Sequence, residues 1–363
     1  KPFSETASDV SILGNLQLYT TGGIMENIPP NPVSAMIAAG SRIWAIDSTN
    51  PGVLWYSKTV IPGSPVEFSD LFTWNVDPNG GTAVGLGYVD GKLIVFKQTG
   101  ISYIVGLGPD ATGGQNDFFE QQVNSDVGCT NPRSIVNIPD GILFRSGKGM
   151  YLLSRSMTLS YVGADVEAYN GQTITSALLV PNTQQARFML GNGTALVYDY
   201  FLQQWAVFTN VAAVDATLWQ GVLTFLRSSG VACQETLGTY SDPGSTAISL
   251  KAVTSWLSFA GIQGFQRVYK ALLLGDYASA HTLSVKVAYN FDSTVAQTNT
   301  ITASSSPPYQ YRIFLARQKC EAIQLTLQDT PTTATEGMDL SSLTLEVGVK
   351  KGAYKLPAAS SAG

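Results

Sequence analysis

The sequence predicts an all-β chain, with a β-propeller of about five or six blades followed by a C-terminal β-sandwich or jelly-roll-like module. The first observation is a repeat: a glycine turn precedes a short apolar run at intervals of about fifty residues, at Gly40, Gly91, Gly141 and Gly193. The second is that each interval holds three short apolar runs separated by turns, as in an antiparallel propeller blade. The third is that no segment combines a sustained helical period with capping residues.

Each repeat is expected to contribute three strands. The first strands are predicted at 33–38, 83–88, 134–138, 175–180 and 211–218; the second at 42–46, 92–96, 142–144, 195–198 and 222–225; the third at 53–56, 101–104, 150–153, 205–208 and 231–233. Glycine suits the turns between them because tight hairpins need a positive φ. The fifth turn, at Gly221, follows Gly193 after only about 28 residues, which predicts a blade without long loops.

Two long segments, 70–81 and 106–126, interrupt the repeat and are rich in Gly, Asn and Asp. Loops of this length in a compact domain are usually functional or mobile, so we expect partners to bind there. The alternative for this half of the chain is a β-sandwich whose turns happen to be evenly spaced.

The predicted organisation has three parts. Residues 1–248 form the propeller, and within it 1–32 supply an opening strand, near 12–19, and a linker; pairing of this strand with the last blade would close the ring. Residues 249–352 form the sandwich, with apolar runs at 250–259, 267–276, 282–289, 298–303, 309–316, 321–328 and 343–349. Residues 353–363 are small and polar, as in a flexible tail. Because the chain begins at Lys1 without Met, we expect an N-terminal portion to be missing.

Composition limits the function classes. Charged residues are 13 % of the chain, against about 25 % in ordinary soluble proteins. A net charge of −5 argues against a surface built to grip phosphates, although not against a channel through which DNA slides. No apolar stretch is long enough for a membrane span. The three cysteines have neither metal-ligand nor redox spacing, so free and mostly buried thiols are predicted.

The sequence offers little catalytic chemistry. The only histidine, His281, is predicted to lie in a surface loop, away from any triad or zinc site. Glycoside hydrolysis would need a pair of acids, and most of the available ones occupy turns. They are Asp47, Asp70, Asp77, Asp90, Asp110, Asp117, Glu120, Asp126, Asp140, Asp165 and Glu167. The segments 85–87 and 106–108 look like fragments of phosphate loops but lack the helix that would follow. The sequence therefore predicts no catalytic, cofactor-binding or metal-binding residue and no cofactor.

Short strings along almost the whole chain, from about 17 to 357, resemble the tail hub or nozzle proteins of short-tailed bacteriophages. In the first half they are 19–23 (YTTGG), 42–44 (RIW), 54–58 (LWYSK), 128–134 and 147–151 (GKGMY). In the second half they are 261–267 (GIQGFQR), 345–348 (LEVG) and 355–357 (KLP). Each string is short and structural, so their order along the chain is the stronger part of the resemblance.

The resemblance implies a non-enzymatic virion protein of the tail, made in the bacterial cytoplasm. Such proteins form a sixfold ring below the portal and its adaptor, extend the DNA ejection channel and anchor fibres, spikes or a needle. We therefore expect a homo-oligomer that contacts these partners, lets DNA pass without sequence-specific binding and does not insert into membranes. The alternative is a carbohydrate-binding or glycan-cleaving propeller that acts on the host surface.

Overall fold

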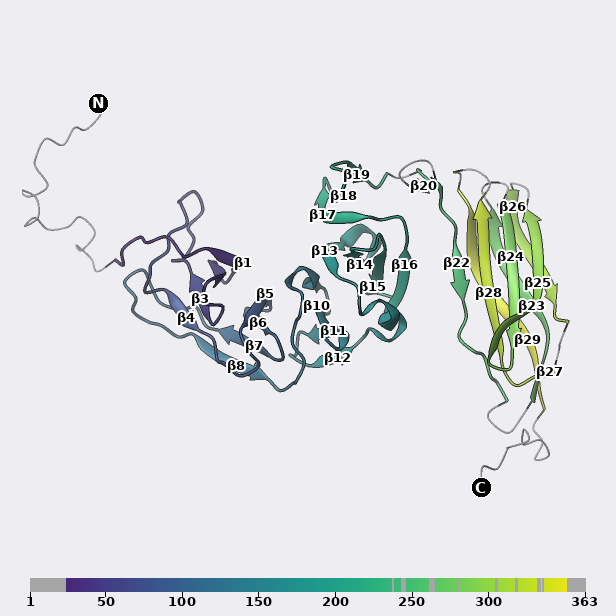
Figure 1. Cartoon of the computed structure of the whole chain (residues 1–363), viewed down its shortest axis with the longest axis horizontal. Helices are drawn as coiled ribbons and strands as arrows, with labels where there is room; N and C mark the ends of the chain where they lie inside the picture. Colours follow the sequence, from purple (N-terminus) through teal and green to yellow (C-terminus); the bar gives the residue numbers. More distant parts are fainter. Residues whose placement is uncertain are drawn as a thin grey trace, which may run out of the picture. The chain divides into compact units, whose positions relative to one another are not determined.

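The computed structural model describes residues 24–236, 238–242, 246–260, 265–277, 279, 281–303, 306–316, 319–331, 334 and 336–350. Nearly all regular structure in these residues is β-strand, which confirms the all-β prediction. The chain divides into a propeller unit, Lys1–Gln234, and a sandwich unit, Glu235–Gly363 (Figure 1). The sequence placed this boundary at 248. The strand expected near 12–19 and the tail expected at 353–363 lie outside the described residues.

The propeller unit contains five successive antiparallel sheets, which are its blades. Blade 1 consists of β1 (Val33–Ala39), β2 (Arg42–Asp47), β3 (Val53–Tyr56) and β4 (Thr73–Asn75). Blade 2 consists of β5 (Ala83–Val89), β6 (Lys92–Lys97), β7 (Ile101–Val105) and β8 (Phe119–Val123). Blade 3 consists of β9 (Val136–Ile138), β10 (Gly141–Ser146), β11 (Gly149–Ser154) and β12 (Leu159–Tyr161). Blade 4 consists of β13 (Ile174–Val180), β14 (Gln185–Leu190), β15 (Ala195–Asp199) and β16 (Gln204–Phe208), and blade 5 of β17 (Ala213–Trp219), β18 (Val222–Arg227) and β19 (Ala232–Gln234).

Helical structure in the described residues is limited to three short 3₁₀ turns. These are η1 (Pro132–Ser134), η2 (Ala164–Tyr169) and η3 (Pro181–Thr183). None of them is long and apolar enough to cross a membrane.

Apolar side chains from neighbouring blades pack against each other. Four buried clusters join blades 1 and 2, 2 and 3, 3 and 4, and 4 and 5 in turn. Close approach is possible at β5 because Gly87 has no Cβ: an added Cβ would lie 2.7 Å from the Ile142 side chain of blade 3. The glycines of 85–87 are therefore packing residues within a strand rather than part of a phosphate loop.

The turn between the first two strands of blade 2 follows the predicted chemistry. Asp90 and Gly91 both have positive φ, 48° and 74°, and Val89 pairs with Lys92 across them. A two-residue hairpin of this type needs positive φ at both central positions, which glycine and aspartate accept most readily.

Blade 4 differs from the prediction. The run 195–198 is its third strand, β15, and the second strand is β14, which the glycine period missed. Gly193 lies in the turn after β14, whereas the turn after β13 contains Gln184 with φ 57°. The interval of about 28 residues thus runs from the second turn of blade 4, at Gly193, to the first turn of blade 5, at Gly221. It does not reflect a shortened blade, since blade 4 has four strands.

The two long segments also differ from the prediction, because each includes the fourth strand of a blade. Residues 70–81 contain β4, and residues 106–126 contain β8. Both strands pair with the strand before them, so blades 1 to 4 are four-stranded rather than three-stranded.

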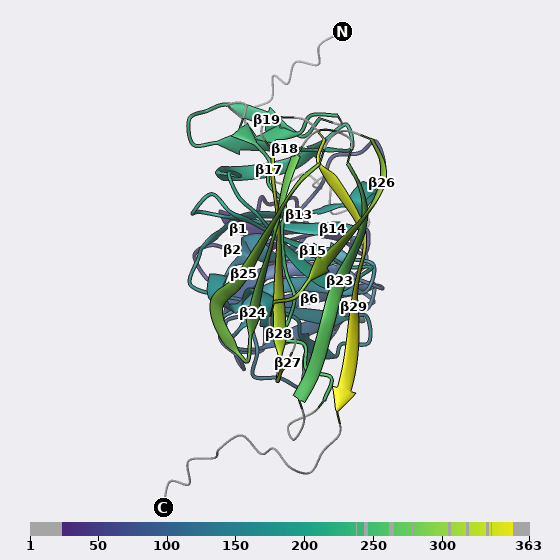
Figure 2. The same ribbon diagram turned by 90° about the vertical axis from the view of Figure 1, so that its right-hand side faces the viewer.

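The sandwich unit has two main antiparallel sheets (Figure 2). One sheet has the order β22 (Lys251–Val253), β28 (Ile323–Pro331), β24 (His281–Tyr289) and β25 (Asp292–Ala303). In the other, β23 (Phe265–Tyr277) pairs on one side with β26 (Ser306–Phe314) and β27 (Lys319–Cys320), and on the other with β29 (Met338–Lys350). A two-stranded sheet, β20 (Ser241–Asp242) and β21 (Thr246–Ala247), lies in the same unit.

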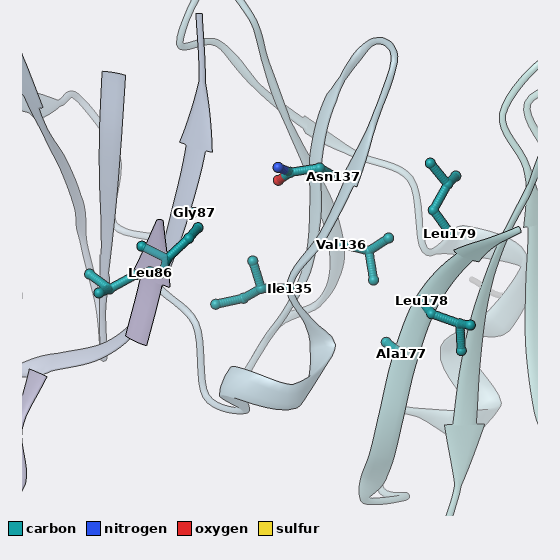
Figure 3. A pocket seen from close by; sticks show the side chains of 9 residues that line it. Leu86, Gly87, Ile135, Val136, Asn137, Ala177, Leu178 and Leu179 are labelled. Carbon is teal, nitrogen blue, oxygen red and sulfur yellow. The ribbon is translucent and has the colours of Figure 1, made fainter. Parts of the chain in front are cut away.

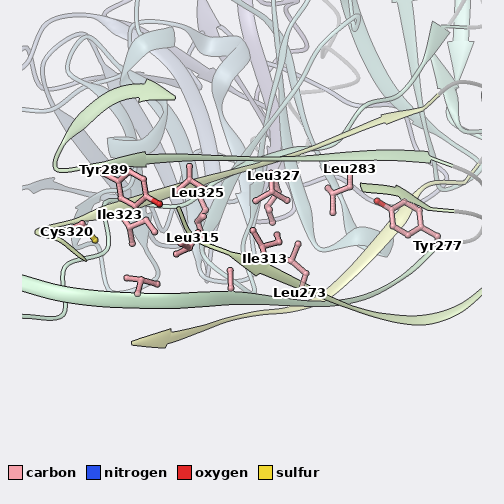
Figure 4. Packing of buried hydrophobic residues seen from close by; sticks show 14 residues of the cluster. Leu273, Tyr277, Leu283, Tyr289, Ile313, Leu315, Cys320, Ile323, Leu325 and Leu327 are labelled. Carbon is pink, nitrogen blue, oxygen red and sulfur yellow. The ribbon is translucent and has the colours of Figure 1, made fainter. Parts of the chain in front are cut away.

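The core of the sandwich comes from the alternation predicted for its strands. In β24 every second side chain from Leu283 to Val287 is fully buried, and in β28 Ile323, Leu325 and Leu327 are buried in the same way. These residues pack on Leu273, Ile313 and other residues of the facing sheet (Figure 4). One inward and one outward face per strand is the pattern of a half-buried antiparallel sheet.

Candidate functional site

The first strands of blades 1 to 4 surround a hollow of about 340 Å³ (Figure 3). It is lined by Ile37, Leu86, Gly87, Ile135, Val136, Asn137, Ala177, Leu178 and Leu179. None of these nine residues is ionisable, and the Asn137 amide donates a hydrogen bond to the Tyr88 carbonyl at 3.0 Å. The lining thus provides no general acid, general base or nucleophile.

The carboxylates that glycoside hydrolysis would require lie elsewhere, and several have structural partners. Asp47 accepts hydrogen bonds from Thr49, Asn31 and Trp55, which hold the pKa of its carboxyl well below its usual range. Asp90 lies 3.6 Å from Arg155, Asp126 lies 2.5 Å from Lys148, and Glu167 accepts a hydrogen bond from Tyr161. None of the carboxylates named from the sequence lines the hollow. In the described part of the chain, no three His, Cys, Asp or Glu residues gather as a metal site would require.

Three segments beside blade 1 are joined to one another by hydrogen bonds. We call residues 24–32, 57–72 and 106–118 the loop cluster. Backbone hydrogen bonds tie these segments together, from Met25 to Ala111 and from Ile28 to Phe68, each at 2.9 Å. Part of this cluster comes from the segment 106–126 in which the sequence predicted partner binding.

Lys58 ties two of these segments together. Its side chain is 7 % exposed, and its ammonium donates to the Met25 carbonyl at 2.6 Å and to the Asn27 side chain at 2.5 Å. The Glu67 carboxylate lies 3.3 Å from the same nitrogen. Because a buried ammonium is stable only when its donors are satisfied, this arrangement favours one conformation of the surrounding chain.

Arg42 holds the third segment. Its guanidinium donates to the carbonyls of Ser57, at 2.8 Å, Leu107, at 3.1 Å, and Pro109. Burial lowers the pKa of Arg42. Guanidinium presents several donors in a rigid fork, which allows this one side chain to join blade 1 to two different segments of the cluster.

An aromatic group lies beneath the Arg42 contact. The Phe118 ring lies 5.0 Å from Trp44 and 5.2 Å from Tyr56 between centroids, in tilted and edge-on geometry. The Arg42 guanidinium lies 5.6 Å from the Tyr56 ring and 5.7 Å from the Phe118 ring. These contacts anchor the end of segment 106–118 in the core of blades 1 and 2.

The start of segment 106–118 binds an anion supplied by the chain itself. The backbone N–H groups of Leu107 and Gly108 donate to the Asp117 carboxylate at 2.8 and 2.6 Å. Successive N–H groups can hold a phosphate in other proteins, but here they hold a side chain of the same loop. The segment 106–108 is therefore not a phosphate loop: its N–H groups are already bonded to Asp117, which orders the loop.

The loop cluster presents large apolar side chains to solvent. These are Ile24 (49 % exposed), Ile61 (63 %), Val66 (46 %), Leu71 (65 %) and Leu107 (77 %). Single exposed apolar residues are common on protein surfaces. Here five exposed apolar residues lie on three segments that are bonded to one another, and two buried cations fix the backbone of these segments. Such a group is a better candidate for a protein-binding surface than a single exposed apolar residue. This cluster is the candidate functional site.

Lys97 forms a second buried link, between blades 1 and 2. Its side chain is fully buried, donates to the carbonyls of Asp77, at 2.7 Å, and Asn79, at 3.0 Å, and lies 3.7 Å from Glu120. Glu120 in turn accepts from the Trp74 indole at 2.9 Å. Of the acids considered for catalysis, Glu120 thus lies beside a lysine of its own blade and joins blade 2 to blade 1 through the Trp74 indole.

The prediction for His281 is wrong. It begins β24, is 2 % exposed, and its Nδ1 lies 2.8 Å from a carboxylate oxygen of Asp329 on β28. The two residues are not cross-strand partners, since His281 pairs with Pro331, and no local pattern in the sequence indicates this contact. The pair lies in the sandwich unit beneath Gly337, where an added Cβ would come within 2.8 Å of Asp329.

The prediction for the cysteines is confirmed. Cys129, Cys233 and Cys320 are all free; Cys129 and Cys320 are buried, and Cys233 is partly exposed. Burial raises the pKa of the Cys129 thiol to about 11, so this group is not poised as a nucleophile.

Comparisons with known proteins assign no family. No known family and no curated protein matches the sequence. Among solved structures, the chain is similar to PorZ, a surface component of the type-IX secretion system of Porphyromonas gingivalis, at 13 % identity and a TM-score of 0.38, over 62 % of this chain and 30 % of PorZ. It is similar to the Pan2 WD40 domain of Neurospora crassa at 9 % identity and a TM-score of 0.35, over 56 % of this chain and 60 % of that one.

A third similar structure is an exo-β-1,3-galactanase of Phanerochaete chrysosporium, at 9 % identity and a TM-score of 0.28, over 89 % of this chain and 98 % of the enzyme. The chain spans less than two thirds of the length of the first two proteins. At these scores none of the three likenesses carries an argument about function.

Proposed function

We propose that this chain is a non-enzymatic structural protein of a phage tail, a hub or nozzle subunit that assembles into a ring and binds tail partners through its loop cluster. The observation that carries the proposal is the construction of that cluster. Arg42 and Lys58 are buried to fix its backbone, while Leu107, Leu71 and Ile61 remain exposed. A surface ordered in advance binds a protein partner with a smaller loss of conformational entropy.

The other polar groups of the propeller unit support the same proposal. Lys97, Glu120 and Asp47 hold blades and turns together, and the hollow among blades 1 to 4 is lined without an ionisable residue. A hollow of about 340 Å³ matches a small ligand in size and is too small for a DNA duplex. A DNA passage would therefore have to be enclosed by several copies of the chain.

The assembly can be tested by sedimentation and mass photometry of the protein, alone and mixed with a portal–adaptor complex. We expect a hexameric ring or a stable complex with the adaptor. Leu107→Lys should abolish the association without lowering the unfolding midpoint, because the Leu107 side chain is 77 % exposed. Phe201→Lys, at a 73 % exposed position on the β15–β16 turn, is the matched control and should leave the association unchanged. A protein that stays monomeric and ignores the complex would contradict the proposal.

The rival function is recognition or cleavage of a host-surface glycan. A glycan array and release of reducing sugar from host envelope polysaccharide test it directly. We expect neither binding nor release. Saturable glycan binding that is lost on substitution at one face of the propeller would replace the structural proposal with the rival.

A further inference from the structure

The outer face of one sandwich sheet carries a group of positively charged side chains. In β23, Val268, Ala271 and Leu273 point into the core, so their neighbours Arg267, Tyr269, Lys270 and Leu272 face outward. Tyr269 and Lys270 face the same way because the pairing of β23 with β29 shifts register between Val268 and Lys270.

The strands beside β23 add to this face. Lys319 of β27 lies opposite Arg267, Phe314 of β26 lies opposite Lys270, and Arg312 lies opposite Leu272. Both Arg312 and Lys319 are exposed, and Phe314 is 70 % exposed. We call Arg267, Tyr269, Lys270, Arg312, Phe314 and Lys319 the basic face. Between the rows of Arg267 and Leu272, the only acidic residue that the structure places on this side of the sheet is Glu346, which pairs with Lys270 at 2.6 Å.

This local charge contrasts with the rest of the chain. The propeller unit, Lys1–Gln234, has 11 Lys and Arg against 17 Asp and Glu, a net charge of −6. The sandwich unit has 10 against 9, a net charge of +1. The basic face holds four cations near one carboxylate, so it is a positive region on an acidic protein. Such a region attracts polyanions locally even when the net charge is negative.

Aromatic rings lie among these cations. An added Cβ on Gly348 would come within 3.1 Å of the Tyr269 ring, which shows that the ring extends across Gly348 on β29. The Arg267 guanidinium lies 6.0 Å from the centre of the same ring, and the Lys319 ammonium lies 4.6 Å from the Phe265 ring. Exposed rings beside cations on an open sheet are the elements with which proteins bind single-stranded nucleic acid: the cations follow the phosphates, and the rings stack with bases.

We propose that the basic face binds single-stranded polynucleotide without sequence preference. Charge alone would fit any polyanion, but the exposed rings of Tyr269 and Phe314 favour a ligand with stackable bases over an acidic protein or polysaccharide. This inference concerns the sandwich unit alone and does not depend on ring formation or on the loop cluster of the propeller unit.

The test is fluorescence anisotropy of the whole chain with a labelled oligothymidine. We expect saturable binding that weakens about 50-fold between 50 and 200 mM salt, if about four phosphates are neutralised. An abasic oligonucleotide of equal length carries the same charge without bases and should bind at least about 5-fold more weakly. The assignment would be overturned if the abasic oligonucleotide or polyglutamate bound as tightly as oligothymidine. It would also be overturned if oligothymidine did not bind at low salt.

Variants locate the site. Replacing both Arg267 and Arg312 with Gln should weaken binding at least about 10-fold and flatten the salt dependence. Tyr269→Ala should weaken it about 5-fold or more, whereas Tyr269→Phe keeps the ring and should restore most of it. Lys286→Gln, on the outer face of the opposite sheet, is the matched control and should change nothing. If Lys286→Gln weakened binding as much as the arginine variants, the basic face would not be the site.

Discussion

Replacing Lys97 with Met tests whether buried cations fasten the blades. Met keeps most of the volume but removes the charge and the two hydrogen bonds to the Asp77 and Asn79 carbonyls, and it leaves Glu120, on a 10 % exposed side chain, without its cation. Breaking a buried ion pair by removing one partner costs about 3–5 kcal/mol. For a unit of this size each kcal/mol lowers the melting temperature by about 2–4 °C, so we expect a loss of about 6–20 °C.

The assay is thermal and urea unfolding followed by tryptophan fluorescence. Five of the six tryptophans, Trp44, Trp55, Trp74, Trp205 and Trp219, belong to the propeller unit, so their signal reports mainly on it. Lys148→Met removes a cation from an exposed pair with Asp126 and should cost less than about 1 kcal/mol. Equal, small losses in Lys97→Met and Lys148→Met would refute the idea that Lys97 fastens blade 1 to blade 2.

Three further predictions concern stability and reactivity. His281→Ala or Asp329→Ala leaves one buried polar partner of the pair without its hydrogen bond and should destabilise the sandwich unit by about 1–3 kcal/mol in urea unfolding, while replacing both with Leu should cost less than the sum of the two. A thiol reagent should label Cys233 in the folded protein well before Cys129, whose thiol is buried; mass spectrometry of the labelled peptides gives the order, and the reverse order would contradict the structure. The ionised Asp47 carboxylate, whose pKa its hydrogen bonds lower in the folded state, stabilises the fold, and this contribution is lost progressively as the pH falls below about 5. Asp47→Asn should therefore flatten the decline of unfolding free energy below about pH 5, and an unchanged pH profile would count against these hydrogen bonds.

Much of the fold could be predicted from local patterns. Gly40 and Gly91 lie in the turns between the first and second strands of their blades, and Gly141 begins the second strand of blade 3. The alternation of 282–289 and 321–328 predicts the two central strands of a sandwich sheet. Tight hairpins require particular residues at adjacent positions, and a half-buried strand requires apolar residues at every second position. Both patterns can therefore be recognised within a few neighbouring residues.

The predictions were wrong where the structure depends on residues far apart in the sequence or on a turn without glycine. In blade 4 the first turn contains Gln184 in a left-handed conformation instead of glycine, so the glycine spacing points to the second turn of this blade. The fourth strands β4 and β8 are short and contain few apolar residues, so their sequences lack a clear strand pattern. His281 meets Asp329, and Lys97 meets Asp77 and Glu120, across long sequence separations that one sequence does not reveal. A lysine that closes an apolar run, as Lys97 closes 92–97, is the one signal that would have marked such a residue.

Electron microscopy of the parent particle would show directly where this chain lies. We expect a ring of copies in the tail, with density for the five-bladed unit in each copy and the loop cluster, including Leu107, against a neighbouring protein. A particle in which this chain is absent from the tail, or in which the loop cluster faces solvent in every copy, would contradict this expectation.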